Sequence, residues 1–245
     1  MLHFFIKINS LKRGDEVIVP EISWSTTYHP LRQFNLKLKI IDVQLETVNI
    51  DTKKLIAAIT PKTKLIIAVN ILGNPYNLFE IRKIRKKKGM YLMEDNCESL
   101  GAKIKNKFCG TFGILNTYSF FYSHHISTIV GGMTLTNDME IKEILISLQS
   151  HGWTRDAVNK KFLTKNYQKF ENYQFVLTEY NLRSTEINAA IGLVRLTKLN
   201  NFIKIRRNNF NLYQKIFKNN KIFIIQKKNE KSQHSLLFLF LKKNI

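Results

Sequence analysis

Cysteine and long apolar runs are both scarce in this sequence. Its 245 residues include only two cysteines, Cys97 and Cys109. Two are too few for a disulfide framework, and too few for a metal or iron–sulfur site with four thiolate ligands. We therefore expect two reduced, partly buried thiols and no metal. No stretch approaches the roughly eighteen consecutive apolar residues that a membrane-spanning helix requires, so we expect no membrane partner.

A secretion signal is also lacking. Residues 1–10 are apolar in part, but they have no charged start, no adequate apolar run and no small-residue cleavage site. We therefore expect a cytoplasmic protein. With 44% hydrophobic and 23% charged residues, the chain can bury one good-sized core, or one large domain plus part of another.

Acidic residues are scarce relative to basic ones, 18 against 39, which gives a formal net charge of +21. Such a charge is one of the marks of nucleic-acid binding. The lysines, however, are spread along the chain, and basic runs such as 82–88 fall where a helix would expose its solvated face. We therefore predict no nucleic-acid partner, and a positive field that favours anionic substrates.

Strands and helices alternate over roughly the first 150 residues. Segment 64–71 (KLIIAVNI) is almost continuously apolar, as expected for a strand covered on both faces. The alternation predicts an α/β sandwich with a largely parallel sheet. Strands are expected at 14–20, 37–43, 64–71, 91–93, 117–121 and 133–136, and helices at 51–59, 78–88 and 138–148, with Asp51 and Asp138 as N-caps.

The pattern changes after Gly152. Residues 154–174 are polar without a clear period, and we interpret them as an excursion or flap. Two helices are then expected at 185–199 and 200–217, and strands at 222–225 and 235–241. We therefore predict a large domain over residues 1–200 and a small, incomplete domain over residues 201–245.

Distinctive polar and aromatic side chains follow the ends of the predicted strands. Ligands bind beyond the carboxyl ends of parallel strands, which predicts that one rim gathers Trp24, Gly73–Asn74, Asp95, Glu98 and His124. Three of these side chains also have a simpler interpretation. Trp24 could pack in the core, Asp95 could cap a helix, and His124 could be an ordinary core or surface histidine.

Eleven segments, taken in order, are similar to the DegT/DnrJ/EryC1/StrS sugar-aminotransferase family of pyridoxal-phosphate proteins. The resemblance covers about residues 12–209. It implies the three-layer α/β/α fold of PLP-dependent transferases (aspartate aminotransferase, type I), with an incomplete small C-terminal α+β domain. The segments are GDEVIVP, ISWSTT, IDVQLETVNID, AAITPKTK, ILGNP, EDNCESLGA, G-x-F-G at 110–113, TYSFFYSHH, GGM-x-LTND, HGW and YNLRSTEINAAIGL.

In this resemblance, His124 takes the place of the lysine to which relatives attach their cofactor. Segment 119–124 reads SFFYSH where the family has S-F-x-x-x-K. An imidazole cannot hold the cofactor covalently, so pyridoxal or pyridoxamine 5'-phosphate would be bound non-covalently, with His124 as the catalytic base. The change resembles the 3-dehydratase branch, which removes the 3-hydroxyl of a 4-keto-6-deoxy sugar nucleotide. Residues 154–175 lack the cysteines of its iron–sulfur members, which favours the glutamate-dependent members that act on GDP-linked sugars.

The resemblance also implies roles for the other site residues. Asp95 would keep the pyridinium nitrogen protonated, Trp24 would stack on the ring, and Glu98 would lie near the ring hydroxyl. Ser119 would bind the cofactor phosphate. Asn181 would reach the phosphate of a neighbouring subunit, which implies a homodimer with a shared active site.

The resemblance weakens toward both ends of the sequence. Residues 1–11 lack the glycine-containing loop with which relatives hold the cofactor phosphate, and a WFGF-like strand survives only as LLFLF at 236–240. Val130 stands where relatives place an acidic or small residue. Each lost charge-assisted hydrogen bond is worth about 1.5–3 kcal/mol, so we expect the chain, interpreted as truncated, to bind its cofactor weakly.

Three functions remain open. The first is a 3-dehydratase of deoxysugar, O-antigen or lipopolysaccharide biosynthesis, with a nucleotide-linked 4-keto sugar and L-glutamate as partners. The second is a nucleotide-sugar aminotransferase that works without the lysine, and the third is an inactive fragment or partner subunit. We predict the first, because transamination generally uses that lysine for proton transfer.

Overall fold

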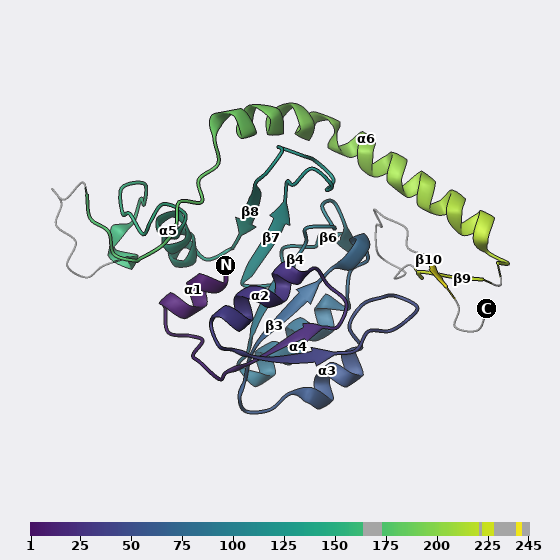
Figure 1. Cartoon of the computed structure of the whole chain (residues 1–245), viewed down its shortest axis with the longest axis horizontal. Coiled ribbons are helices and arrows are strands. Elements are labelled where there is room, and N and C mark those ends of the chain that lie inside the picture. Colours follow the sequence, from purple (N-terminus) through teal and green to yellow (C-terminus); the bar gives the residue numbers. More distant parts are fainter. Residues whose placement is uncertain (164–172, 221, 228–238, 242–245) are drawn as a thin grey trace.

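A six-stranded sheet lies at the centre of the computed structural model, which describes residues 1–163, 173–220, 222–227 and 239–241 (Figure 1). The strand order is β2-β1-β3-β4-β7-β8; the first five strands are parallel and only β8 runs antiparallel. The prediction of a largely parallel sheet is therefore confirmed. The strands are β1 (Glu16–Pro20), β2 (Lys37–Ile41), β3 (Thr63–Val69), β4 (Tyr91–Asp95), β7 (Leu115–Ser119) and β8 (Gly132–Leu135).

Helices cover both faces of the sheet, because successive strand residues point to opposite sides. Val17 and Val19 of β1 pack in one core cluster with residues of α1 (Leu2–Lys7), α2 (Ser25–Gln33) and α5 (Met139–Leu148). Ile18 packs in the other, with residues of α3 (Thr52–Ala58) and α4 (Leu78–Lys88). Because strand side chains alternate between the two faces, the sheet is covered by helices on both, which gives three layers: helices, sheet, helices.

The helix boundaries in this region follow local capping chemistry. The Asp51 carboxylate accepts the N–H groups of Lys53 and Lys54, and Asp138 accepts that of Ile141, so both predicted N-caps are confirmed. Gly89 ends α4 in the left-handed conformation (φ 67°). Short 3₁₀ turns occur at Ile71–Gly73 (η1) and Lys160–Phe162 (η2), and β5 (Lys103–Ile104) pairs with β6 (Lys107–Phe108).

The C-terminal part corrects one prediction. A single helix α6, Glu186–Phe217, replaces the two helices expected at 185–199 and 200–217. Neither proline nor glycine stands near residue 200, so nothing interrupts the backbone hydrogen bonds there. The helix starts at a capping box formed by Thr185 and Asn188. The predicted domain boundary at residue 200 therefore falls inside α6, and the division itself stays a prediction.

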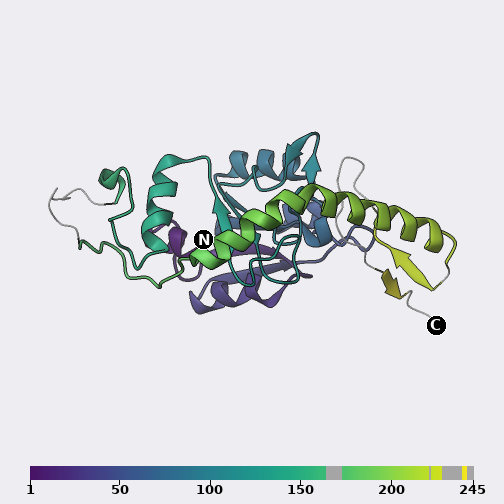
Figure 2. The ribbon, with the colours of Figure 1, turned by 90° about the horizontal axis from the view of Figure 1, so that it is seen from above.

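Figures 1 and 2 show α6 running past the sheet toward a small hairpin of β9 (Phe223–Ile225) and β10 (Leu239–Leu241). Residues 164–172 of the predicted flap, and most of the LLFLF segment, lie outside the described residues. Helix α1, whose side chains Phe4 and Phe5 are almost fully buried, is not among the elements predicted from the sequence. Within the described part of the chain, no helix is long and apolar enough to cross a membrane.

Candidate active site

A cavity of about 720 Å³ lies at the carboxyl ends of β3, β4 and β7. Its size falls within the usual range of small-molecule sites. The side chains that line it include Trp24, Asn70, Asp95, Glu98, Ser119 and His124. The structure thus brings five of the six predicted site residues to one place, although they come from segments up to 100 residues apart.

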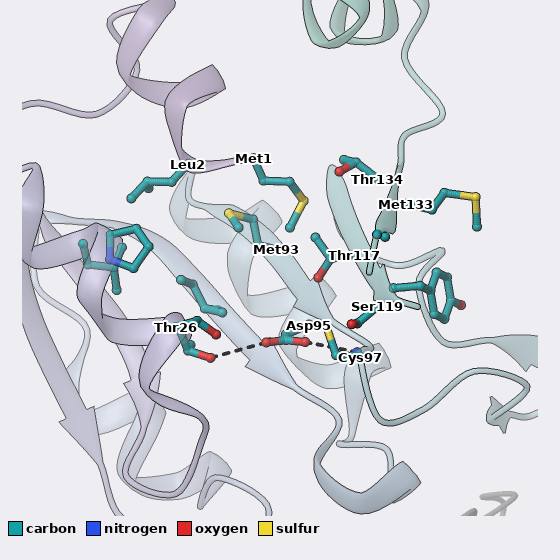
Figure 3. Close-up of a pocket in the computed structure, with 17 residues that line it drawn as sticks. Met1, Leu2, Thr26, Met93, Asp95, Cys97, Thr117, Ser119, Met133 and Thr134 are labelled. Carbon is teal, nitrogen blue, oxygen red and sulfur yellow. Dashed lines mark hydrogen bonds between the residues drawn. The ribbon is translucent and has the colours of Figure 1, made fainter. Parts of the chain in front are cut away.

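Asp95 is the last residue of β4, and donors on two sides hold its carboxylate. Oδ1 accepts the backbone N–H of Cys97 at 3.1 Å, and Oδ2 accepts the Thr27 hydroxyl at 3.3 Å (Figure 3). The Thr27 and Ser23 hydroxyls are 2.8 Å apart and continue this network to the start of α2. Ser23 and Thr27, which support Asp95, are not among the site residues predicted from the sequence. The hydroxyls of the ISWSTT segment were the available signal, but nothing in the sequence links them to residue 95.

A smaller cavity, about 350 Å³, shares Asp95, Cys97 and Ser119 with the first and extends toward Thr117 and Thr134 (Figure 3). Asp95 therefore borders two hollows of the same rim. Burial, with a smaller contribution from Asp95, raises the pKa of the Cys97 thiol. Cys97 consequently stays protonated and is not an activated nucleophile.

His124 closes a tight turn in the loop after β7. The backbone N–H of His124 donates to the carbonyl of Phe121 at 3.0 Å. The backbone N–H of Thr128 donates to the carbonyl of Phe120 at 2.9 Å and so fixes the base of the loop. The pKa of His124 is lowered, mainly by burial and to a smaller extent by the charge of Arg206 on α6. The negative charges of Glu98 and Asp95 oppose this reduction. The net reduction keeps the imidazole neutral near pH 7, the form that a general base requires.

His125 differs from its neighbour. It does not line the cavity, it is 3% exposed, and burial, followed by the charge of Arg206, lowers its pKa to about 3. We interpret it as a buried neutral imidazole. Among the described residues, no group of three or more histidine, cysteine or acidic side chains could hold a metal ion.

Trp24, Glu98 and Ser119 complete the wall. Trp24 precedes α2 and is 75% exposed, so the alternative of core packing is wrong for this indole. Glu98 Oε2 accepts the N–H of Leu72 at 2.6 Å and so holds the η1 turn, in which Leu72 has a positive φ of 55°. Ser119 ends β7, and its hydroxyl accepts the N–H of Phe121 at 3.2 Å.

Gly73 and Asn74, both predicted at the rim, do not line the cavity, and neither does Asn181, which was predicted to act on a neighbouring subunit. Asn74 is fully buried, and its amide donates to the carbonyl groups of Thr47 and Lys227, so the rim prediction for this residue is wrong. Its strand ends at Val69, and the η1 turn carries Asn74 away from the cavity. Asn181 is exposed and forms an isolated antiparallel β-bridge with Ser150. It does not line the cavity of its own chain. Its role toward a neighbouring subunit stays a prediction.

The fold is that of vitamin-B6-dependent sugar enzymes. The chain belongs to the DegT/DnrJ/EryC1/StrS aminotransferase family, whose profile matches residues 1–244. It is 45% identical over 244 residues to a GDP-4-keto-6-deoxy-D-mannose 3-dehydratase of Escherichia coli O55:H7, covering 98% of this chain and 63% of the relative. The chain thus spans less than two thirds of that relative's length.

Solved structures agree with this assignment. A variant of GDP-4-keto-6-deoxymannose-3-dehydratase with bound GDP-perosamine superposes with a TM-score of 0.92 at 44% identity, over 99% of this chain and 64% of that one. The E. coli dehydratase with bound hydrated PLP gives 0.91 at 45% identity, over 98% of this chain and 63% of the other. The expected fold of PLP-dependent transferases is confirmed.

Proposed function

We propose that this chain carries the active-site rim of a nucleotide-sugar 3-dehydratase that uses pyridoxal or pyridoxamine 5'-phosphate without a covalent link. One observation carries the proposal: residue 124, where the family has its lysine, is a histidine that lines the same cavity as Asp95. The 45% identity to a dehydratase over nearly the whole chain supports the same assignment.

The side chains of the cavity fit such a cofactor. The Asp95 carboxylate, with one donor on each oxygen, keeps acceptor capacity for a pyridinium N–H. The exposed indole of Trp24 can stack on a flat ring, and Ser119 can donate to the phosphate. When bound, the cofactor would supply an amino group for the sugar ketone and a ring that withdraws electrons.

His124 is the group in this cavity suited to move a proton. The neutral imidazole takes up a proton and can return it, and the charges of Glu98 and Asp95 favour the protonated state that forms in between. Asp95 would accept the N–H of the cofactor ring and so hold the ring nitrogen in its protonated form. A lysine at position 124 would instead hold the cofactor covalently, as aminotransferases of the family do.

We propose a GDP-linked 4-keto-6-deoxy sugar as the substrate and L-glutamate as the amine donor. Relatives at 44–45% identity carry the name GDP-4-keto-6-deoxy-D-mannose 3-dehydratase, and one similar structure contains GDP-perosamine. The net charge of +21 favours such an anionic nucleotide. These names also suggest a place in deoxysugar and lipopolysaccharide biosynthesis, as the name of a Salmonella relative does.

We further propose a homodimer with a shared active site. Large apolar side chains of α6 face solvent, among them Ile187 (69% exposed), Leu193 (70%) and Leu196 (56%). An apolar surface of this kind is typical of a protein interface. The exposed position of Asn181, just before α6, would let it reach the cofactor phosphate of the second subunit.

Product analysis tests the proposal. The chain is incubated with pyridoxal phosphate, L-glutamate and GDP-4-keto-6-deoxymannose, and the sugar is followed by NMR beside a His124→Asn variant. A 3-deoxy-4-keto sugar with release of ammonia, absent in the variant, is the expected result. An amino sugar would assign the chain to the aminotransferases, and an unchanged substrate would assign it to the inactive fragments or partner subunits.

A further inference from the structure

Behind Asp95 lies a buried carboxylate that takes no part in the cavity. Glu94, the preceding residue of β4, is 0% exposed and points to the opposite face of the sheet. Its Oε1 accepts the N–H groups of Phe112 (2.6 Å) and Gly113 (2.8 Å), and its Oε2 accepts that of Gly110 (2.8 Å). Burial raises the pKa of Glu94, and these three donors oppose that rise.

The G-x-F-G segment is shaped to receive this carboxylate. Gly110 has a φ of +84°, which favours glycine, and a Cβ on Gly113 would lie 2.7 Å from the carbonyl oxygen of Leu92. The backbone can therefore approach β4 closely and direct three N–H groups at one point. Such a concave group of N–H donors is an anion-binding arrangement, and the anion here is a side chain of the chain itself.

Asn96, the residue that follows Asp95, is also fixed by buried hydrogen bonds. Its Oδ1 accepts the Asn70 amide at 2.7 Å and the Ser99 hydroxyl at 3.1 Å, and both asparagines are fully buried. The backbone N–H of Asn70 also donates to the carbonyl of Asp95 at 3.0 Å. Asp95 thus stands between two residues whose side chains are fixed by buried hydrogen bonds, an arrangement that rigidifies the strand end.

We propose that Glu94 is the positioning residue of this site. Its carboxylate ties the end of β4 to the 110–113 turn, and this fixes the direction in which Asp95 faces the cavity. The inference relies on the proposed function only for the identity of the ligand that Asp95 meets. The simpler alternative is that Glu94 stabilises the fold and nothing more.

The variant Glu94→Gln separates these alternatives, because an amide cannot accept hydrogen bonds on its NH₂ side and must leave at least one of the three N–H groups without an acceptor. Glu143→Gln is the matched control. Glu143 is also a buried carboxylate (1% exposed) that accepts a backbone N–H, that of Val158 at 2.7 Å, but it lies on α5 and does not line the cavity.

The first readout needs no cofactor. The amides of Cys97 and Asn70 donate to the side chain and the backbone of Asp95, so their hydrogen exchange reports how firmly Asp95 is held. After correction for global stability, we expect exchange at least about tenfold faster in Glu94→Gln, as for loss of one hydrogen bond, and unchanged in Glu143→Gln. Equal protection of both amides in the two variants would overturn the proposal.

The second readout is equilibrium binding of pyridoxal phosphate. We expect its dissociation constant to rise about tenfold more in Glu94→Gln than in Glu143→Gln. Wild-type chain that binds no cofactor would contradict the proposed function, while the exchange experiment would still decide the role of Glu94. If Glu94→Gln does not fold, Glu94→Asp serves instead: it keeps the charge on a shorter side chain, and we expect intermediate values. Wild-type exchange and affinity in Glu94→Asp would overturn the proposal.

Discussion

The rim of the sheet and helix α6 differ in what surrounds their side chains: hydrogen-bond donors of the same chain at the rim, and solvent along α6. At the rim, Asp95 and Glu98 each accept hydrogen bonds from donors of the same chain. Along α6, only Ile203 and Phe210 are buried, and apolar side chains such as Leu193 and Ile216 are 70% and 60% exposed. The donors that hold the rim carboxylates therefore come from one chain, whereas α6 presents a surface suited to a second protein.

The largest effect should come from the centre of the rim. Replacing His124 by asparagine keeps a polar side chain but removes the proposed base, and we expect the rate of sugar dehydration to fall by about 10²- to 10⁴-fold. The measurement is the steady-state rate of 3-deoxy sugar formation. His29→Asn, an exposed histidine of α2, is the control. Comparable rates for the two variants would mean that His124 is not the base.

Asp95→Asn should weaken cofactor binding by about ten- to a hundredfold, because a neutral amide gives up the charged hydrogen bond to the ring nitrogen. Fluorescence titration with pyridoxal phosphate measures this. Asp51→Asn is a suitable control, since asparagine also caps helices and Asp51 begins α3 away from the cavity. An affinity unchanged by Asp95→Asn would remove Asp95 from the site.

The proposal that α6 forms the dimer interface can be tested separately. Leu193→Glu places a charge on the exposed apolar surface, and we expect the dimer dissociation constant to rise at least about tenfold, as for a central interface residue. Analytical ultracentrifugation measures the change, with Lys198→Glu, exposed on the same helix, as the control. A monomeric wild-type chain, or a dimer that tolerates Leu193→Glu, would exclude α6 as the interface.

The smallest effect concerns His125 and pH. Its folded-state pKa, about 3, lies below the ordinary value of 6.5, so below pH 6.5 the unfolded chain binds a proton that the folded chain does not. Folding stability should therefore decrease as pH falls from 6.5 toward 3, by at most about 1.4 kcal/mol per pH unit from this group. Urea unfolding at pH 7 and 5 would show this slope, which should be smaller in His125→Gln. Equal slopes in both proteins would contradict it.

Local patterns predicted the part of the fold that lies around the rim. The apolar run of β3 and the N-caps Asp51 and Asp138 are each encoded within a few residues, and all were predicted. The rim positions of Asp95 and His124 followed from the strand ends.

The supports of the site could not be predicted in the same way. The hydrogen bond from Thr27 to Asp95 joins residues 68 positions apart, and the bonds of Glu94 reach residues 16 to 19 positions away. No periodicity encodes such pairs, because they form only when the sheet assembles. The continuous α6 was missed for a different reason: its apolar residues face outward, so the pattern did not follow burial within one chain.

Mass mapping after borohydride reduction with pyridoxal phosphate tests most directly the claim that His124 occupies the place of the family's lysine. The wild-type chain should carry no stoichiometric cofactor label, whereas His124→Lys should be labelled at residue 124 and at no other lysine. A wild-type chain labelled stoichiometrically at one of its own lysines, or a folded His124→Lys variant without label, would contradict the account.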